Sequence, residues 1–231
     1  MVWQIIKKEI IHNKHWMGLA LGFLLFFTTV IYVEQVKMEQ RNTPQNYAVN
    51  SEISLWSIYG SGSYTIHIRS FSALYFFSAA GLGILVGVSQ FWVPFFTNTW
   101  KFTLHRPIKR SAALTLMLLS AAFIIALIAG GSWTILWLKA KSQFTLPPTT
   151  GALAEGWLFV LEGFVAYLAV ALAALNQHRW YTAKFLPLLF AFLTWIVMWT
   201  TVSFTGAIMA AGIYILIVMP LIYRKFETRE F

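Results

Sequence analysis

Six long apolar runs dominate the sequence and decide which folds are open to it. They cover roughly Trp16–Val33, Phe71–Phe96, Ala112–Leu138, Gly156–Leu175, Phe185–Phe204 and Gly206–Tyr223. A helix needs about 20 mostly apolar residues to cross the hydrocarbon core of a bilayer. Backbone groups in lipid must be paired within the segment, and the alternation typical of barrel strands is absent. The runs therefore predict an all-α, polytopic membrane protein, with six transmembrane helices in one transmembrane domain, 1–231.

The composition supports this class and excludes several kinds of chemistry. Of the 231 residues, 58% are hydrophobic and 11% are charged, whereas soluble domains average about 25% charged residues. The chain has no cysteine, and its acidic residues are all glutamates. Disulfides, thiolate metal sites and mechanisms built on an aspartate are therefore excluded. Gly60-Ser61-Gly62 has neither the spacing nor the lysine of a phosphate loop. We expect no catalytic, cofactor-binding or metal site, and no enzymatic activity in this chain.

The placement of lysine and arginine predicts the orientation. With the N-terminus in the cytoplasm, the inner segments hold twelve basic residues: Lys7, Lys8, Lys14, Lys101, Arg106, Lys109, Arg110, Arg179, Lys184, Arg224, Lys225 and Arg229. The outer segments hold five: Lys37, Arg41, Arg69, Lys139 and Lys141. Basic residues concentrate in cytoplasmic loops, so both termini are predicted to be cytoplasmic. The net charge of +9 is explained by binding to membrane lipids, because anionic headgroups attract basic residues next to the membrane. No nucleic-acid partner is expected.

The segments outside the apolar runs leave two alternatives open. Residues 1–15 fit an amphipathic interfacial helix, with Trp3, Ile6 and Ile10 on one side, or a plain extension of the first span. The polar segment 34–70 is expected to be an outer loop. The last two runs are separated by a predicted tight turn near Phe204–Gly206, and they form either two spans or one pair of half-inserted helices.

Glu162 is an ionisable residue inside an apolar run, between Leu161 and Gly163. A charged side chain near the bilayer centre costs roughly 2.5–3.5 kcal/mol on insertion scales, so such residues face the bundle interior or water. Glu162 either lines a path for a substrate or proton, or has a structural role. In the structural role it is protonated and bonded to a neighbouring helix, or hydrated near the outer interface.

Small residues at four-residue spacing mark expected helix contacts. Gly83 and Gly87 have this spacing in the second run, and Gly206 and Ala210 have it in the sixth. Such faces allow close approach of helices in lipid. They predict a compact bundle or a dimer, without identifying a partner.

The segment 97–111 is the most distinctive part of the predicted inner face. Trp100, Leu104 and Ile108 recur at four-residue spacing, as on one face of a helix. Lys101, His105 and Arg106 fall beside or behind that stripe. Pro107 disfavours helical geometry at the residue before it, so a short helix is expected to end near His105. A basic inner loop with an interfacial tryptophan explains the same residues without any partner.

This loop resembles that of the type-2 ABC (ATP-binding-cassette) export permeases. In that family an acidic residue is followed by Gly-Thr, an apolar stretch, and Pro-apolar-small-Arg. Here Asn98-Thr99 stands for Gly-Thr, and Phe102-Thr103-Leu104 stands for the apolar stretch. Pro107-Ile108-Lys109-Arg110 stands for the closing element. Pro94 and Phe95 occupy the place of the acidic residue, and Met117 occupies that of a later lysine.

The resemblance implies a function and a set of partners. It implies a permease subunit of an ABC exporter in the bacterial cytoplasmic (inner) membrane, paired with a second permease chain as a homodimer or heterodimer. Cytoplasmic ABC ATPase subunits would bind ATP and Mg and would dock on the loop 97–111 as a coupling loop. The implied ATPase-coupling residues are Trp100, Leu104, His105, Arg106, Pro107, Ile108 and Arg110, with Glu162 as the path-lining candidate. The alternative is a non-transporting structural or assembly subunit of a larger membrane complex.

Overall fold

The computed structural model describes residues 77–97, 109–143, 150–176, 183–200 and 204–228. Every secondary-structure element in these ranges is helical, which confirms the predicted all-α class for this part of the chain. The predicted first span Trp16–Val33, the segment 1–15 and the loop 34–70 lie outside the described residues.

Four described helices are long and apolar enough to cross a membrane: Phe77–Phe96, Arg110–Leu138, Gly156–Leu175 and Phe204–Thr228. Each coincides with one of the apolar runs. The third belongs to a longer helix, Thr150–Leu175, which ends at the predicted residue but begins six residues before Gly156. The last extends beyond Tyr223 as the 25-residue helix α9 (Phe204–Thr228). These helices define an integral membrane protein, and α9 by its length fits a full span better than a half-inserted helix.

The described part of the fifth apolar run is mostly one helix. After one 3-10 turn, η4 (Ala183–Phe185), helix α8 extends over the 15 residues Leu186–Thr200. At a rise of 1.5 Å per residue, such a helix covers about 22 Å, less than the roughly 30 Å of a hydrocarbon core. Residues 201–203 of the expected turn lie outside the described residues.

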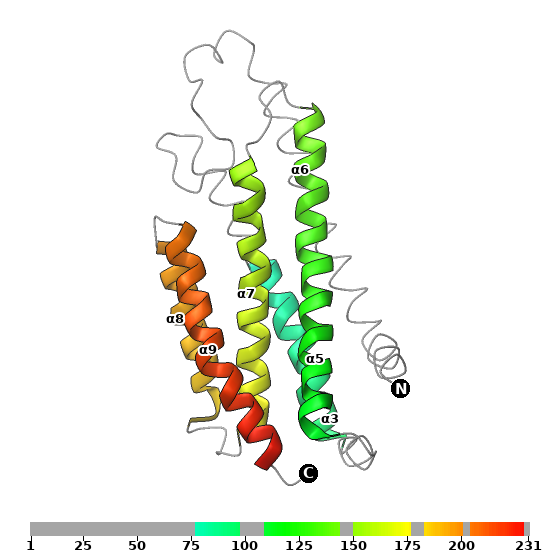
Figure 1. The fold of residues 1–231 in the computed structure, drawn as a ribbon, viewed down its shortest axis with the longest axis vertical. Helices are drawn as coiled ribbons and strands as arrows, with labels where there is room; N and C mark the ends of the chain where they lie inside the picture. The colour runs from blue at the N-terminus through cyan, green and yellow to red at the C-terminus, as the bar shows by residue number, and fades with distance from the viewer. Residues whose placement is uncertain (1–76, 98–108, 144–149, 177–182, 201–203, 229–231) are drawn as a thin grey trace.

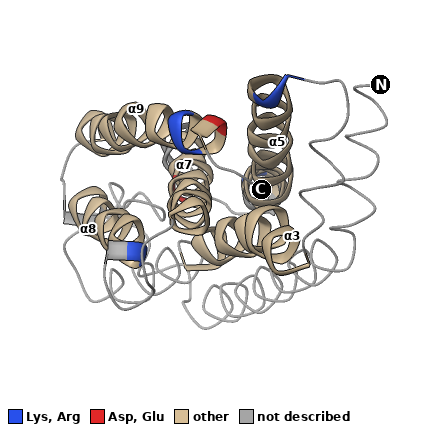
Figure 2. Cartoon of the chain, turned by 90° about the horizontal axis from the view of Figure 1, so that it is seen from below, with Lys and Arg blue, Asp and Glu red and all other residues tan. Residues whose placement is uncertain are grey.

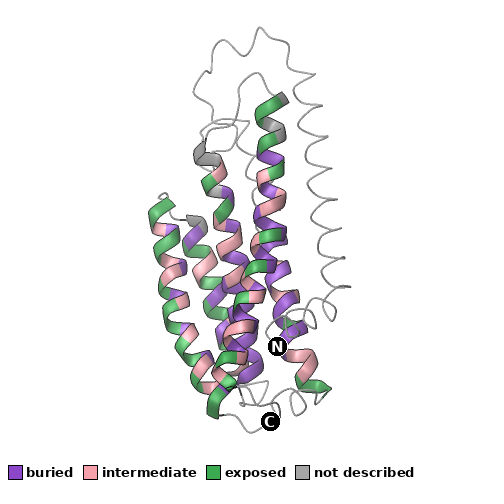
Figure 3. Ribbon diagram, turned by 45° about the vertical axis from the view of Figure 1, so that its right-hand side comes forward, coloured by how far each residue is buried: buried purple, intermediate pink, exposed green. Residues whose placement is uncertain are grey.

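Helix α7 (Thr150–Leu175) is the centre of the bundle. It lies between the pair α8 and α9 on one side and α5 (Arg110–Ile125) and α6 (Gly131–Gln143) on the other (Figure 1). In the most apolar 18-residue stretch of α7, 78% of the residues are buried, against 28% in the corresponding stretch of α9. Figure 3 shows this difference as a largely buried α7 and mixed, outward-exposed faces on α8 and α9.

Two helices contain a wider π turn. In Phe77–Phe96 it is η2 (Val88–Trp92), which leads into α3 (Val93–Phe96). Pro94 follows directly, and in a regular α-helix its ring would clash with the carbonyl group four residues earlier. The wider turn relieves that clash. The second turn, η3 (Ala126–Gly130), joins α5 to α6, and it ends at the first of the two consecutive glycines 130 and 131.

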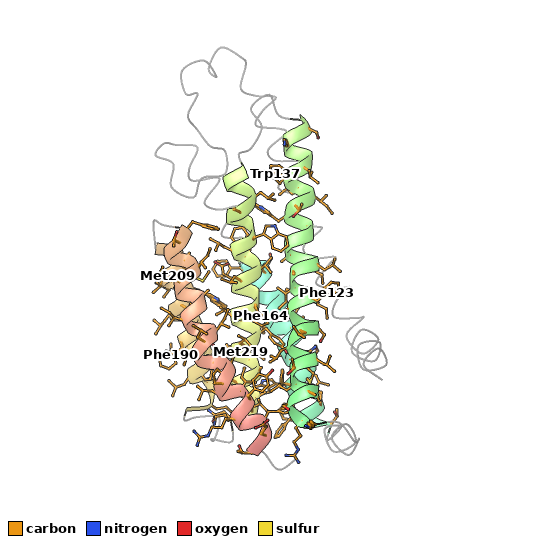
Figure 4. All side chains as sticks on the ribbon, in the orientation of Figure 1. Phe123, Trp137, Phe164, Phe190, Met209 and Met219 are labelled. Carbon is orange, nitrogen blue, oxygen red and sulfur yellow. The ribbon has the colours of Figure 1, made fainter. Side chains whose placement is uncertain are left out.

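The outward faces of the bundle carry large apolar side chains. Phe123 of α5 is 66% exposed and Phe190 of α8 is 55% exposed, and they point away from α7 on opposite sides of the bundle (Figure 4). Leu216 of α9 is 75% exposed. Large exposed apolar side chains of this kind suit contact with lipid chains.

Helix Phe77–Phe96 approaches α7 at the predicted glycine pair. A β-carbon on Gly83 would overlap the carbonyl oxygen of Gly163 and lie 2.8 Å from its carbonyl carbon. A β-carbon on Gly87 would lie 2.9 Å from Val170 Cβ. Gly163 also has no room for a side chain, since its β-carbon would lie 2.8 Å from the oxygen of Ala79. The Gly83–Gly87 pattern therefore serves a contact within this chain.

We predict that Gly83→Ala lowers the stability of the bundle, because the new methyl group requires two backbones to separate. Overpacking of this kind costs typically about 1–3 kcal/mol. Thermal unfolding of the detergent-solubilised chain measures the effect.

Gly81→Ala is the matched control, because nothing lies within 4 Å of its β-carbon position on the same helix. It should be neutral or slightly stabilising, since alanine favours a helix over glycine by about 1 kcal/mol. Equal stability of the two variants would contradict the close crossing.

Candidate functional site

Glu162 is buried at the middle of α7, with 4% of its surface exposed. It directly precedes Gly163, at the level where α7 and helix Phe77–Phe96 approach each other most closely. Its atom Oε2 is buried and has no hydrogen-bond partner in the described part of the chain. The carboxyl group therefore lies in the bundle interior, as expected for an ionisable residue within a span.

A chain of polar side chains links three helices about five residues further along α7. The Tyr167 hydroxyl donates to Gln90 Oε1 at 2.7 Å, and Gln90 Nε2 donates to Ser120 Oγ at 3.2 Å. Ser120 in turn donates to the backbone oxygen of Met117 at 2.8 Å. Gln90 belongs to the π turn η2 and is 2% exposed. The network thus fixes η2 against α5 and α7.

Aromatic rings surround this network. Phe164 stacks on Tyr167 with ring centroids 5.9 Å apart, and Phe91 lies 6.1 Å from Tyr167 at a tilted angle. Aromatic pairs in such arrangements contribute about 0.5–1.5 kcal/mol beyond their area burial. The rings hold Tyr167 in the orientation that its hydrogen bond to Gln90 requires.

One end of the bundle carries most of the described positive charge. Lys109, Arg110, Lys184, Arg224 and Lys225 lie where α5 begins, α8 begins and α9 ends (Figure 2). We call this the basic end. In the described part of the chain only Glu227 adds a negative charge there.

Polar contacts at the basic end join helices that are far apart in sequence. Arg110 Nη1 donates to the backbone oxygen of Glu227 at 3.2 Å, which links the start of α5 to the end of α9. The Thr115 and Tyr223 hydroxyl groups lie 2.7 Å apart, one turn further into the bundle. Because these bonds satisfy groups at helix termini, they fix the ends of α5 and α9 together.

A second set of contacts involves α7 and α9. Lys225 Nζ donates to Asn176 Oδ1 at 3.0 Å, just after the last residue of α7. The carbonyl groups at a helix C-terminus carry partial negative charge, which favours a nearby ammonium group. The basic end therefore also connects α9 to the central helix.

Trp92 connects η2 to the segment before α8. Its Nε1 donates to the oxygen of Val170 at 3.3 Å, and the Lys184 ammonium lies 4.9 Å from its ring centroid. Its ring also stacks on Phe185, with centroids 6.3 Å apart. A cation over an indole face is attracted by the ring quadrupole, by about 0.5–1 kcal/mol at exposed sites.

The predicted coupling residues are described only at their C-terminal end. Trp100, Leu104, His105, Arg106, Pro107 and Ile108 lie outside the described residues. Arg110 is the first residue of α5 and follows Lys109, whose extended backbone (φ −58°, ψ 133°) marks the end of the loop. The two helices that bracket the loop, Phe77–Phe96 and α5, are joined through Gln90 and Ser120.

Sequence reasoning did not single out Gln90, Tyr167, Asn176 or Lys225 as a connected set. A signal existed for Gln90, because it is an amide inside an apolar run of spanning length. Its partners are 30 and 77 residues away, and hydropathy carries no information about such pairs. In the described residues no group of three or more His, Asp or Glu side chains comes together to hold a metal ion.

Comparison with known proteins gives no relative for this arrangement. No protein-family model matches the chain, and no curated protein or solved structure matches it. What the chain does is therefore inferred from its own residues.

We predict that Tyr167 and Gln90 are energetically coupled. Tyr167→Phe, Gln90→Leu and the double variant form a double-mutant cycle, measured as the free energy of unfolding in detergent. Interhelical hydrogen bonds in membrane proteins average about 0.6 kcal/mol in such cycles and reach about 1.7 kcal/mol. A coupling energy in this range is expected, and strict additivity of the two single variants would contradict the bond.

Proposed function

We propose that this chain is the membrane permease subunit of an ATP-binding-cassette transporter, an exporter, that is powered by a separate cytoplasmic ATPase chain. In this proposal the chain has six transmembrane helices, and both termini lie in the cytoplasm of a bacterial cell. A second permease chain completes the transport path. The proposal rests on the resemblance of the loop 97–111 and on the arrangement of the helices around it.

The observation that carries the proposal is the connection of this loop to the basic end. The loop follows helix Phe77–Phe96 and ends at Arg110, which bonds to the end of α9. The other described segments at this end are also basic. Cytoplasmic loops are enriched in lysine and arginine, so the basic end is the face that we assign to the cytoplasm. An ATPase docked there would contact the loop and the end of α9 together.

A mechanism follows from the contacts that surround the loop. A push on the loop would act on α3 and on the first turn of α5, since these flank it, and α3 directly continues η2. Gln90 and Trp92 would pass that motion to α7, because both bond to it. Arg110 would pass it to α9. In this proposal the helices rock as connected elements, and the partner's ATP hydrolysis supplies the energy.

A structural or assembly subunit without a transport path is the competing proposal. It uses the same basic end to anchor the chain at the membrane surface and requires no ATPase. The two proposals therefore differ in whether the chain retains and stimulates an ATPase.

We predict that the basic end faces the cytoplasm. The chain has no cysteine, so Glu227→Cys at the basic end and Lys141→Cys at the opposite end introduce unique thiols at exposed positions. A membrane-impermeant maleimide applied to intact cells should label Lys141→Cys only. Permeabilised cells should show labelling of both variants. Labelling of Glu227→Cys in intact cells would contradict the orientation.

We predict that Trp100→Ala and Arg110→Glu each weaken retention of the ATPase at least about tenfold, which corresponds to about 1.4 kcal/mol. Aromatic and arginine residues are prominent among interface contacts whose loss costs 2 kcal/mol or more. Copurification and ATPase stimulation, at matched membrane expression, are the measurements. Pro107→Ala should have a milder effect.

Lys141→Glu is the control for charge reversal, because Lys141 is exposed near the far end of the continuous helix that starts at Arg110. It should leave coupling unchanged. Wild-type coupling in both Trp100→Ala and Arg110→Glu would leave the loop as a basic inner loop without a docking role. Absence of any copurifying ATPase with the wild-type chain would favour the structural subunit.

A further inference from the structure

No described side chain of opposite charge lies at the level of the buried carboxyl group of Glu162. Helix Phe77–Phe96 and α8 contain no lysine, arginine, histidine or acidic residue. The charged residues of the other helices packed in the bundle lie near helix ends: Arg110, Lys139, Lys141, Arg224, Lys225 and Glu227. On α7 itself, Glu155 lies two turns before Glu162. No described cation therefore comes to the level of this carboxyl group.

The other titratable side chains of the described helices are tyrosines, and each has a partner. Tyr167 bonds to Gln90, Tyr214 donates to the oxygen of Pro187, and Tyr223 lies against Thr115. None of these contacts involves Glu162. Its Oε2 is buried without a hydrogen bond, which is very unfavourable for an ionised carboxylate and far less so for a neutral acid.

A metal ion is a poor alternative for neutralising this group. Calcium and magnesium take six or more oxygen ligands in most sites, with several carboxylates or waters among them. The described residues hold no cluster of ligating side chains. The adjacent Gly163 packs against the backbone of Ala79, so the helices at this level are already in contact. The smallest cation, a proton, fits this environment best.

We propose that Glu162 is a proton-binding site within the bundle and carries its proton when α7 is packed against helix Phe77–Phe96. The proton adds to one carboxylate oxygen and comes from water, to which it returns on release. No electron is transferred. Release leaves a charge beside the Gly83–Gly163 crossing, so it requires either water at this level or separation of the helices. The site binds protons whether or not an ATPase partner exists.

Infrared spectroscopy of the purified full chain, in a detergent without ester groups, tests this site directly. At about pH 7 an exposed glutamate is ionised, since its ordinary pKa is about 4.3. The wild-type chain should show a carbonyl band of a protonated carboxyl group that shifts in deuterated water. Glu162→Gln should lose the band. Glu227→Gln should retain it, because Glu227 is exposed. Raising the pH far enough should remove the wild-type band as the proton is released.

A second variant keeps the test decisive if Glu162→Gln fails to insert. Eight acidic residues are present, all glutamates, and replacing every one except Glu162 by glutamine leaves one carboxyl side chain. That variant should keep the band. Absence of the band from both the wild type and this variant at about pH 7 would overturn the proposal. So would its persistence in a folded Glu162→Gln chain.

Discussion

The approach of two backbones at Gly83 and Gly163 is the contact on which the rest of this bundle depends. Helices in lipid gain little from burying apolar side chains against one another, because the lipid is equally apolar. Their association depends on van der Waals packing and interhelical hydrogen bonds, and both need short distances. Glycine at both positions brings helix Phe77–Phe96 onto α7 at backbone contact. This contact in turn lets Gln90 and Trp92 bond to α7 further along the same pair of helices.

Polar groups of the described residues lie at three successive levels along the bundle. Glu162 lies beside the glycine crossing, the Gln90–Tyr167–Ser120 network lies below it, and the contacts of Arg110 and Lys225 close the basic end. The network is fully bonded, so it stabilises one arrangement of the helices. Glu162 has a buried oxygen without a hydrogen bond and is the titratable group beside the glycine crossing.

Hydropathy predicted much of this fold, because lipid imposes a length on every spanning helix. The C-terminal bound Leu175 of α7 was predicted correctly, although the helix begins at Thr150 rather than at Gly156. The spacing of Gly83 and Gly87 indicated a helix contact. Hydropathy did not predict the π turns, since it carries no information about hydrogen-bond register. The cost of charge in lipid left Glu162 either in the bundle interior or in contact with water, and the structure buries it. The pairing of Arg110 with the end of α9 joins residues 117 positions apart and could not be read from either segment alone.

The central claim is that α7 is the protein-facing axis of a bundle whose outer faces contact lipid. Nitroxide labels on introduced cysteines test it in reconstituted bilayers, since the native chain has none. Labels at Phe123, Phe190 and Leu216, all exposed, should be accessible to oxygen and protected from a water-soluble nickel complex. A label at Ala169, which is fully buried on α7, should be protected from both and strongly immobilised. High nickel accessibility at the three outer positions, or a mobile label at Ala169, would contradict this arrangement.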